Sequence, residues 1–195
     1  MSILNMLTQT IAGDNLENLA GQLGMNKNQA SSAVSAALPM IMGALARNTS
    51  SQEGAASLSN ALDNDHDGGI LDMAGAFLGN KDNGAGPGIL KHLFGEKRGG
   101  IETAVSSMAG IDAGQAGGLL ENLAPLVMGM LGKQKRQQGL DIAGLASLIG
   151  GESQQASSAS STAMNLLSGI LDKDGDGSMI DDIGGMLGGL LGGKR

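Results

Sequence analysis

Two short segments of the sequence carry aspartate at alternate positions and follow the third aspartate with glycine. Alternate carboxylates converge where the chain curls, and glycine permits the sharp turn, as in calcium loops of the EF-hand type. An aspartate at the tenth position and a backbone carbonyl at the seventh would complete each set. The predicted calcium ligands are Asp172, Asp174, Asp176, Ser178 and Asp181 in the loop at 172–181, and Asp63, Asp65, Asp67, Gly69 and Asp72 in the loop at 63–72.

Both loops depart from the EF-hand pattern at the twelfth position, where a bidentate Glu is expected. Ile183 stands there in the later loop and Ala74 in the earlier one. Loops without that ligand belong to the weak end of the range, with a Kd on the order of 10⁻⁴–10⁻³ M. Such sites are mostly empty at cytoplasmic calcium levels, so structural calcium would favour an extracellular or cell-surface location.

The same residues have a second interpretation, as ordinary turn and helix-capping residues. Asp and Gly are common in turns. Ser178 followed by Asp181 also resembles the start of a helix with an acidic first turn. On this interpretation the loops position helices and bind no metal.

Catalytic chemistry has little support in the sequence, because an enzyme needs a convergent nucleophile, base or metal set. The chain has no Cys, and its two histidines, His66 and His92, have no evident partners. We expect His66 to point to solvent. Many Ser residues lie in low-complexity stretches such as 157–161. We therefore expect a non-catalytic protein without a small-molecule substrate.

The charge pattern disfavours a nucleic-acid partner. The formal net charge is −7, whereas a phosphate-binding surface needs clustered Lys and Arg. The densest basic group, Lys133, Lys135 and Arg136, is expected to mark the end of a helix, where cations interact favourably with the dipole. A helix-turn-helix outline at 16–37 remains a weaker alternative, because its second helix offers Lys27 alone.

The composition predicts an all-α fold. β-branched residues and aromatics, which favour strands, are scarce; there are two Phe and neither Trp nor Tyr. The chain instead holds 34 Gly and 12 Met among many Leu and Ala residues. Such helices gain stability from close backbone approach rather than from large rings.

An internal repeat organises these helices. Pro125 lies 86 positions after Pro39, and Gly129 lies 86 positions after Gly43, within the same apolar frame. Asn26 and Asp112 occupy equivalent positions as predicted N-caps, and each interior proline should kink or divide its helix. The acidic loops repeat at a spacing of 109 positions.

The predicted architecture is therefore multi-helical, with two tandem helical repeats, each followed by a helix–acidic loop–helix unit. Four segments follow from this plan. They are a first repeat with its acidic loop at 1–79, a linker and short helix at 80–98, a second repeat at 99–150, and a Ser/Ala-rich linker, acidic loop and Gly-rich helix at 151–195.

The segment LAGQLGM at 19–25, followed by AALPMIMGALARN at 36–48, resembles the bacterial YidB-like family, a domain of unknown function. The paired Asp/Gly loops also look like that family. Together with the second copy, the resemblance covers most of the chain. It implies a helical bacterial protein and supplies no catalytic residues to transfer.

The segment at 183–193 repeats glycine every four residues, which on a helix gives a flat groove beside a ridge of Met and Leu. Close packing on another helix would compensate for its low helix propensity, although a free terminus is the alternative. We therefore expect a self-associating structural protein, an oligomer or filament. A helical adaptor for another protein is the alternative, and without a signal-peptide pattern or a bilayer-length apolar run the default location is the cytoplasm.

Overall fold

In the computed structural model, residues 2–66, 68–78 and 84–159 are described. These residues form helices and no β-strand, so the all-α prediction is confirmed. The helices are α1 (Ile3–Ile11), α2 (Asp14–Leu23), α3 (Lys27–Asn48), α4 (Gln52–Asn64), α5 (Gly69–Asp72), α6 (Ala74–Leu78), α7 (Gly86–Phe94), α8 (Arg98–Ala109), α9 (Ala113–Gln138) and α10 (Ile142–Ala159), with a 3₁₀ turn at Gly95–Lys97.

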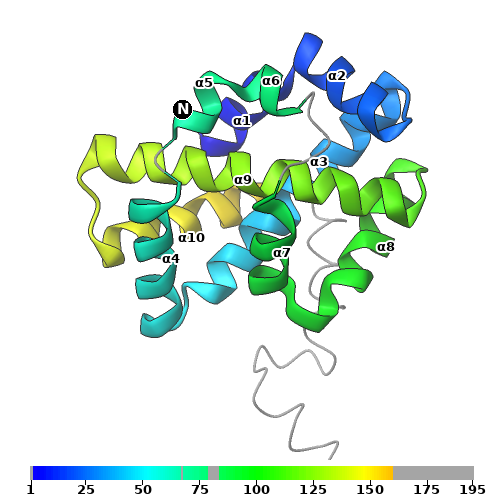
Figure 1. Ribbon diagram of the computed structural model, residues 1–195. Helices are drawn as coiled ribbons and strands as arrows, with labels where there is room; N and C mark the ends of the chain where they lie inside the picture. Colours follow the sequence, from blue (N-terminus) through cyan, green and yellow to red (C-terminus); the bar gives the residue numbers. More distant parts are fainter. Residues whose placement is uncertain (1, 67, 79–83, 160–195) are drawn as a thin grey trace, which may run out of the picture.

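Two long helices, α3 and α9, form the centre of the molecule. Figure 1 shows α9 lying across the molecule and α3 crossing it, and the two are in contact. Every residue of the segments 36–45 and 122–132 is buried. A helix buried on all sides must be apolar around its whole circumference, which explains why these segments consist mainly of Leu, Ala, Met, Ile and Gly.

The helix α3 is also long and apolar enough to cross a bilayer, by length and composition alone, and no other helix in the described residues is. From the sequence we expected no apolar run of bilayer length, so this property of α3 was not predicted. Because 72% of its apolar window is buried inside the protein, its position equally suits a core helix.

Both central helices begin with the same capping arrangement. The side chains of Asn26 and Asp112 accept hydrogen bonds from the backbone N–H groups of Gln29 and Gln115, respectively. Each glutamine Oε1 accepts a bond in return from the backbone N–H of the cap residue. These are reciprocal capping boxes, and they confirm the two predicted N-caps.

The same glutamines join the helical pair α2–α3 to the pair α8–α9. Nε2 of Gln29 donates to the carbonyl of Gly110 at 2.9 Å, and Nε2 of Gln115 donates to the carbonyls of Gly24 at 3.0 Å and Leu23 at 3.1 Å. Gly24 and Gly110 end α2 and α8 with φ of +67° and +65°, a conformation that favours glycine. Each pair therefore satisfies carbonyl groups at a helix end of the other.

Pro39 and Pro125 lie inside α3 and α9, and both helices continue through them. Of the two outcomes expected at proline, division of the helix is therefore wrong, and a kink stays a prediction. Proline removes one helical hydrogen bond and crowds the preceding turn. Burial on every side of these segments offsets that loss.

The helix α10 closes the bundle against α3 and α4. The carboxylate of Glu152 accepts hydrogen bonds from the backbone N–H groups of Ile3 at 3.0 Å and Leu4 at 3.3 Å, and from Oγ of Ser2 at 2.7 Å. A carboxylate at a helix N-terminus is electrostatically favourable. α10 begins at Ile142 and continues to Ala159, into the segment at 151–195 whose start was expected to be a Ser/Ala-rich linker. α7 lies within the segment at 80–98 that was predicted to hold a linker and a short helix, with Pro87 in its first turn.

Candidate functional site

The first acidic loop is divided between two helix ends. Asp63 lies in the last turn of α4 and Asp65 at its C-cap, while Gly69 begins and Asp72 ends α5. Asp67 is outside the described residues. Among the residues that are described, no group of three or more His, Cys, Asp or Glu side chains is placed to hold a metal. Calcium binding in this loop stays a prediction.

The second acidic loop lies wholly outside the described residues, as does the Gly-rich segment at 183–193. Its predicted calcium ligands therefore have no structural description. They are Asp172, Asp174, Asp176, Ser178 and Asp181.

The carboxylate of Asp63 already has a cationic partner. Nζ of Lys135 lies 2.5 Å from Oδ2 of Asp63 and also donates to Oγ of Ser59 at 2.7 Å and to the Ser59 carbonyl at 3.2 Å. The Lys135 side chain is only 10% exposed. Lys135 does lie in the last turn of α9, as expected, but it is buried there and binds α4. Calcium ligation by Asp63 would require Lys135 to give up this carboxylate.

The acidic loop is held closely against α9. Gly68 has φ of +91°, and a Cβ on it would lie 3.0 Å from Cβ of Lys133 and 3.3 Å from the carbonyl oxygen of Gly129. A Cβ on Gly129 would in turn lie 2.5 Å from Cγ2 of Ile70. Gly68 before α5 and Gly129 in α9 therefore allow the two helices to approach each other closely.

An apolar surface follows directly after this loop. Met73, between α5 and α6, is 66% exposed, more than any other large apolar side chain in the described residues. It borders an open groove of about 290 Å³ that is also lined by Gly69, Ile70, Ala76 and Phe77. We call these five residues the α5–α6 face.

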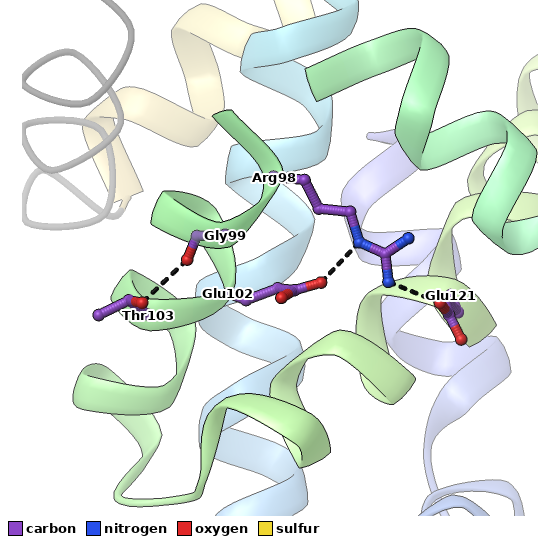
Figure 2. A network of polar contacts seen from close by, with 5 residues as sticks. All are labelled: Arg98, Gly99, Glu102, Thr103 and Glu121. Carbon is purple, nitrogen blue, oxygen red and sulfur yellow. Dashed lines mark hydrogen bonds and ion pairs between the residues drawn. The ribbon is translucent and has the colours of Figure 1, made fainter. Parts of the chain in front are cut away.

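A polar network joins α8 to α9 away from the acidic loop (Figure 2). Nε of Arg98 lies 2.6 Å from Oε1 of Glu102, and Nη2 of Arg98 lies 2.6 Å from Oε1 of Glu121. The hydrogen bond to Glu102 is the main reason that the pKa of Arg98 is raised. With every charge paired in this way, the network fits a structural link rather than a reactive group.

A cavity of about 190 Å³ brings together residues of α4, α7 and α9 with Asn48 at the end of α3. Both histidines of the chain line it, together with apolar side chains that include Leu58, Ile89 and Met128. The expectation that His66 points to solvent is wrong, because this side chain is half-buried in the cavity wall. The sequence did not predict that His66 and His92 line the same cavity, because they belong to different helical segments.

These observations define a helical protein with two buried central helices, an acidic loop beside an apolar groove, and a small cavity. The chain belongs to a family of bacterial proteins of unknown function, DUF937, which it matches over residues 5–134 and 136–194. The match confirms the resemblance found in the sequence. Comparison with curated proteins and with solved structures gave no match.

Proposed function

We propose that the protein is a non-catalytic structural protein that self-associates through the α5–α6 face, with weak calcium binding in the acidic loops promoting the association. The observation that carries this proposal is the position of Met73, a 66% exposed apolar side chain immediately beyond the first acidic loop. Exposed apolar groups rimmed by polar residues are typical of protein interaction surfaces. Methionine suits such surfaces because its side chain is flexible and polarizable.

Charge explains why calcium would matter to such an association. The chain has a net charge of −7, so two copies repel each other. Asp65 and Asp72 are exposed next to the α5–α6 face, where a bound divalent cation would reduce that repulsion locally. Weak affinity for calcium fits a location outside the cytoplasm, whereas association without calcium would fit either location.

The test is the solution mass of the pure full-length protein, measured by light scattering in millimolar calcium and in chelator. We expect a larger particle in calcium, and a monomer in both conditions for Met73→Glu. Ile142→Glu is the matched control, because Ile142 is the other exposed large apolar side chain in the described residues, at 40%. A monomeric wild type in both conditions would reject self-association. Equal association in both conditions would reject the calcium part alone.

The α5–α6 face also suits the alternative of a cytoplasmic helical adaptor that binds another protein. The two proposals differ in whether the pure protein associates with itself. The helix-turn-helix alternative gains no support, since Lys27 is paired with Glu17 at 2.6 Å and Gln29 is bonded to Gly110.

A further inference from the structure

The cavity between α4, α7 and α9 has an apolar interior and a polar rim. Leu58 and Met128 are buried, while Ala61, Ile89 and Leu93 are partly buried along its walls. His92 is exposed at the cavity mouth, and His66 is half-buried. An apolar cavity of about 150 Å³ is large enough to bind benzene. The volume here, about 190 Å³, therefore admits one ring with a small substituent.

Both imidazoles are available for hydrogen bonding. Neither imidazole has a hydrogen bond to a side chain or backbone group in the described part of the chain. An imidazole ring has two nitrogens that can take part in hydrogen bonds.

We propose that this cavity binds a small uncharged molecule with an apolar ring or short chain and one hydroxyl or carbonyl group. The apolar part fills the space between Leu58, Ile89 and Met128, and the polar group bonds an imidazole at the rim. This compound class follows from the lining, which is mostly apolar and has the two imidazoles, Asn48 and Ser57 as its polar side chains. The proposal is independent of the α5–α6 face and of calcium.

A charged ligand fits less well. None of the described residues that line the cavity is Lys or Arg, so a buried carboxylate would have no cationic partner there. Asp65, whose charge reaches His66, would also repel it. A zinc ion fits poorly as well, because two imidazoles are fewer than the three or four protein ligands of ordinary zinc sites.

The experiment follows the imidazole signals of the two histidines by NMR, because the chain contains no others. The full-length protein is titrated with benzyl alcohol, toluene and benzoate, which share one ring and differ in the polar group. We expect saturable shifts of both imidazole signals with benzyl alcohol. Toluene should bind about threefold to tenfold more weakly, the ratio expected for one hydrogen bond, and benzoate should bind most weakly.

Ala61→Phe fills the cavity from α4 and should abolish the shifts. Asn60→Phe is the matched control, because Asn60 is exposed on the same helix. If Ala61→Phe does not fold, His92→Phe at the exposed mouth replaces it, and it should weaken benzyl alcohol to the level of toluene. The proposal is overturned if no compound gives a saturable shift, if benzoate binds best, or if the cavity variant binds as the wild type does.

Discussion

At the scale of single residues, two buried charged groups connect one helix to another. Lys135 of α9 holds Ser59 and Asp63 of α4, and Glu152 of α10 holds the start of α1. A buried charge is tolerated only when it is paired or fully hydrogen-bonded. These residues therefore fix which helices are neighbours, whereas the apolar core supplies most of the burial.

The pair between Lys135 and Asp63 gives a stability prediction. Asp63→Asn leaves the 10% exposed Lys135 side chain without its counter-charge. We expect the free energy of unfolding to fall by about 1–2 kcal/mol, within the range for an under-satisfied buried group. Urea unfolding followed by circular dichroism measures it. Glu17→Gln, which breaks an exposed pair with Lys27, should leave the unfolding midpoint unchanged, and an equal loss in both variants would contradict the prediction.

The half-buried His66 gives a prediction about pH. Because burial lowers its pKa below the usual 6.5, the unfolded chain takes up a proton at His66 more readily than the folded protein does. Stability must therefore fall as the pH drops below 6.5, until His66 is protonated in the folded protein as well.

Melting temperatures at about pH 7.5 and about pH 5.5 bracket this titration. His66→Gln should lose less stability than the wild type between the two conditions, since its side chain does not titrate. The difference between the two proteins measures the contribution of the His66 side chain. His92→Gln, at an exposed position, is the control and should behave as the wild type. An unchanged pH dependence in His66→Gln would show that this burial has no thermodynamic effect.

At the scale of helices, local rules predicted where a helix begins better than they predicted which helices pack against it. Asn26 and Asp112 satisfy a capping pattern that depends on the next three residues, so both helix starts were predictable. The cavity histidines were not, because their meeting depends on how α4 and α7 pack on α9. Pro39 also misled, because a rule for isolated helices gives no weight to burial on every side.

Glycine within helices has two different roles here, and substitution separates them. A Cβ on Gly132 of α9 would overlap the carbonyl oxygen of His66, whereas a Cβ on Gly21 of α2 meets nothing within 4 Å. Gly132→Ala should therefore lower the free energy of unfolding by roughly 1–3 kcal/mol through overpacking. Gly21→Ala should raise it by about 0.5–1 kcal/mol through helix propensity. Chemical denaturation of both variants checks this, and a stabilising Gly132→Ala would mean that α4 does not approach α9 so closely.

At the scale of the whole molecule, the two helical pairs share one core. Nearly all of the described buried apolar residues form a single cluster that runs from Ile3 to Ile149. α3 contacts α8, α9 and α10, which all come from the later half of the described chain, while α9 contacts α1, α2 and α4 from the earlier half. Neither long helix is covered by its own half alone. This arrangement could not be predicted from the repeat, because two similar halves could equally have formed two separate cores.

The shared core predicts one cooperative unfolding transition. Urea unfolding followed by circular dichroism and by the imidazole signals of His66 and His92 should give coincident midpoints. Fragments 1–84 and 85–195, made separately, should each be largely unfolded, because each would expose the face of its long helix that the other covers. Mixed together, they should regain helical signal in a concentration-dependent way.

Different midpoints for the His66 and His92 signals in the full chain, or stable helical structure in either fragment alone, would contradict this prediction. The matched control cuts the chain after the last described helix. A fragment of residues 1–159 keeps every described helix, so it should unfold in one transition as the full chain does. A loss of folding in that fragment would instead assign part of the stability to residues 160–195, whose structure is not described.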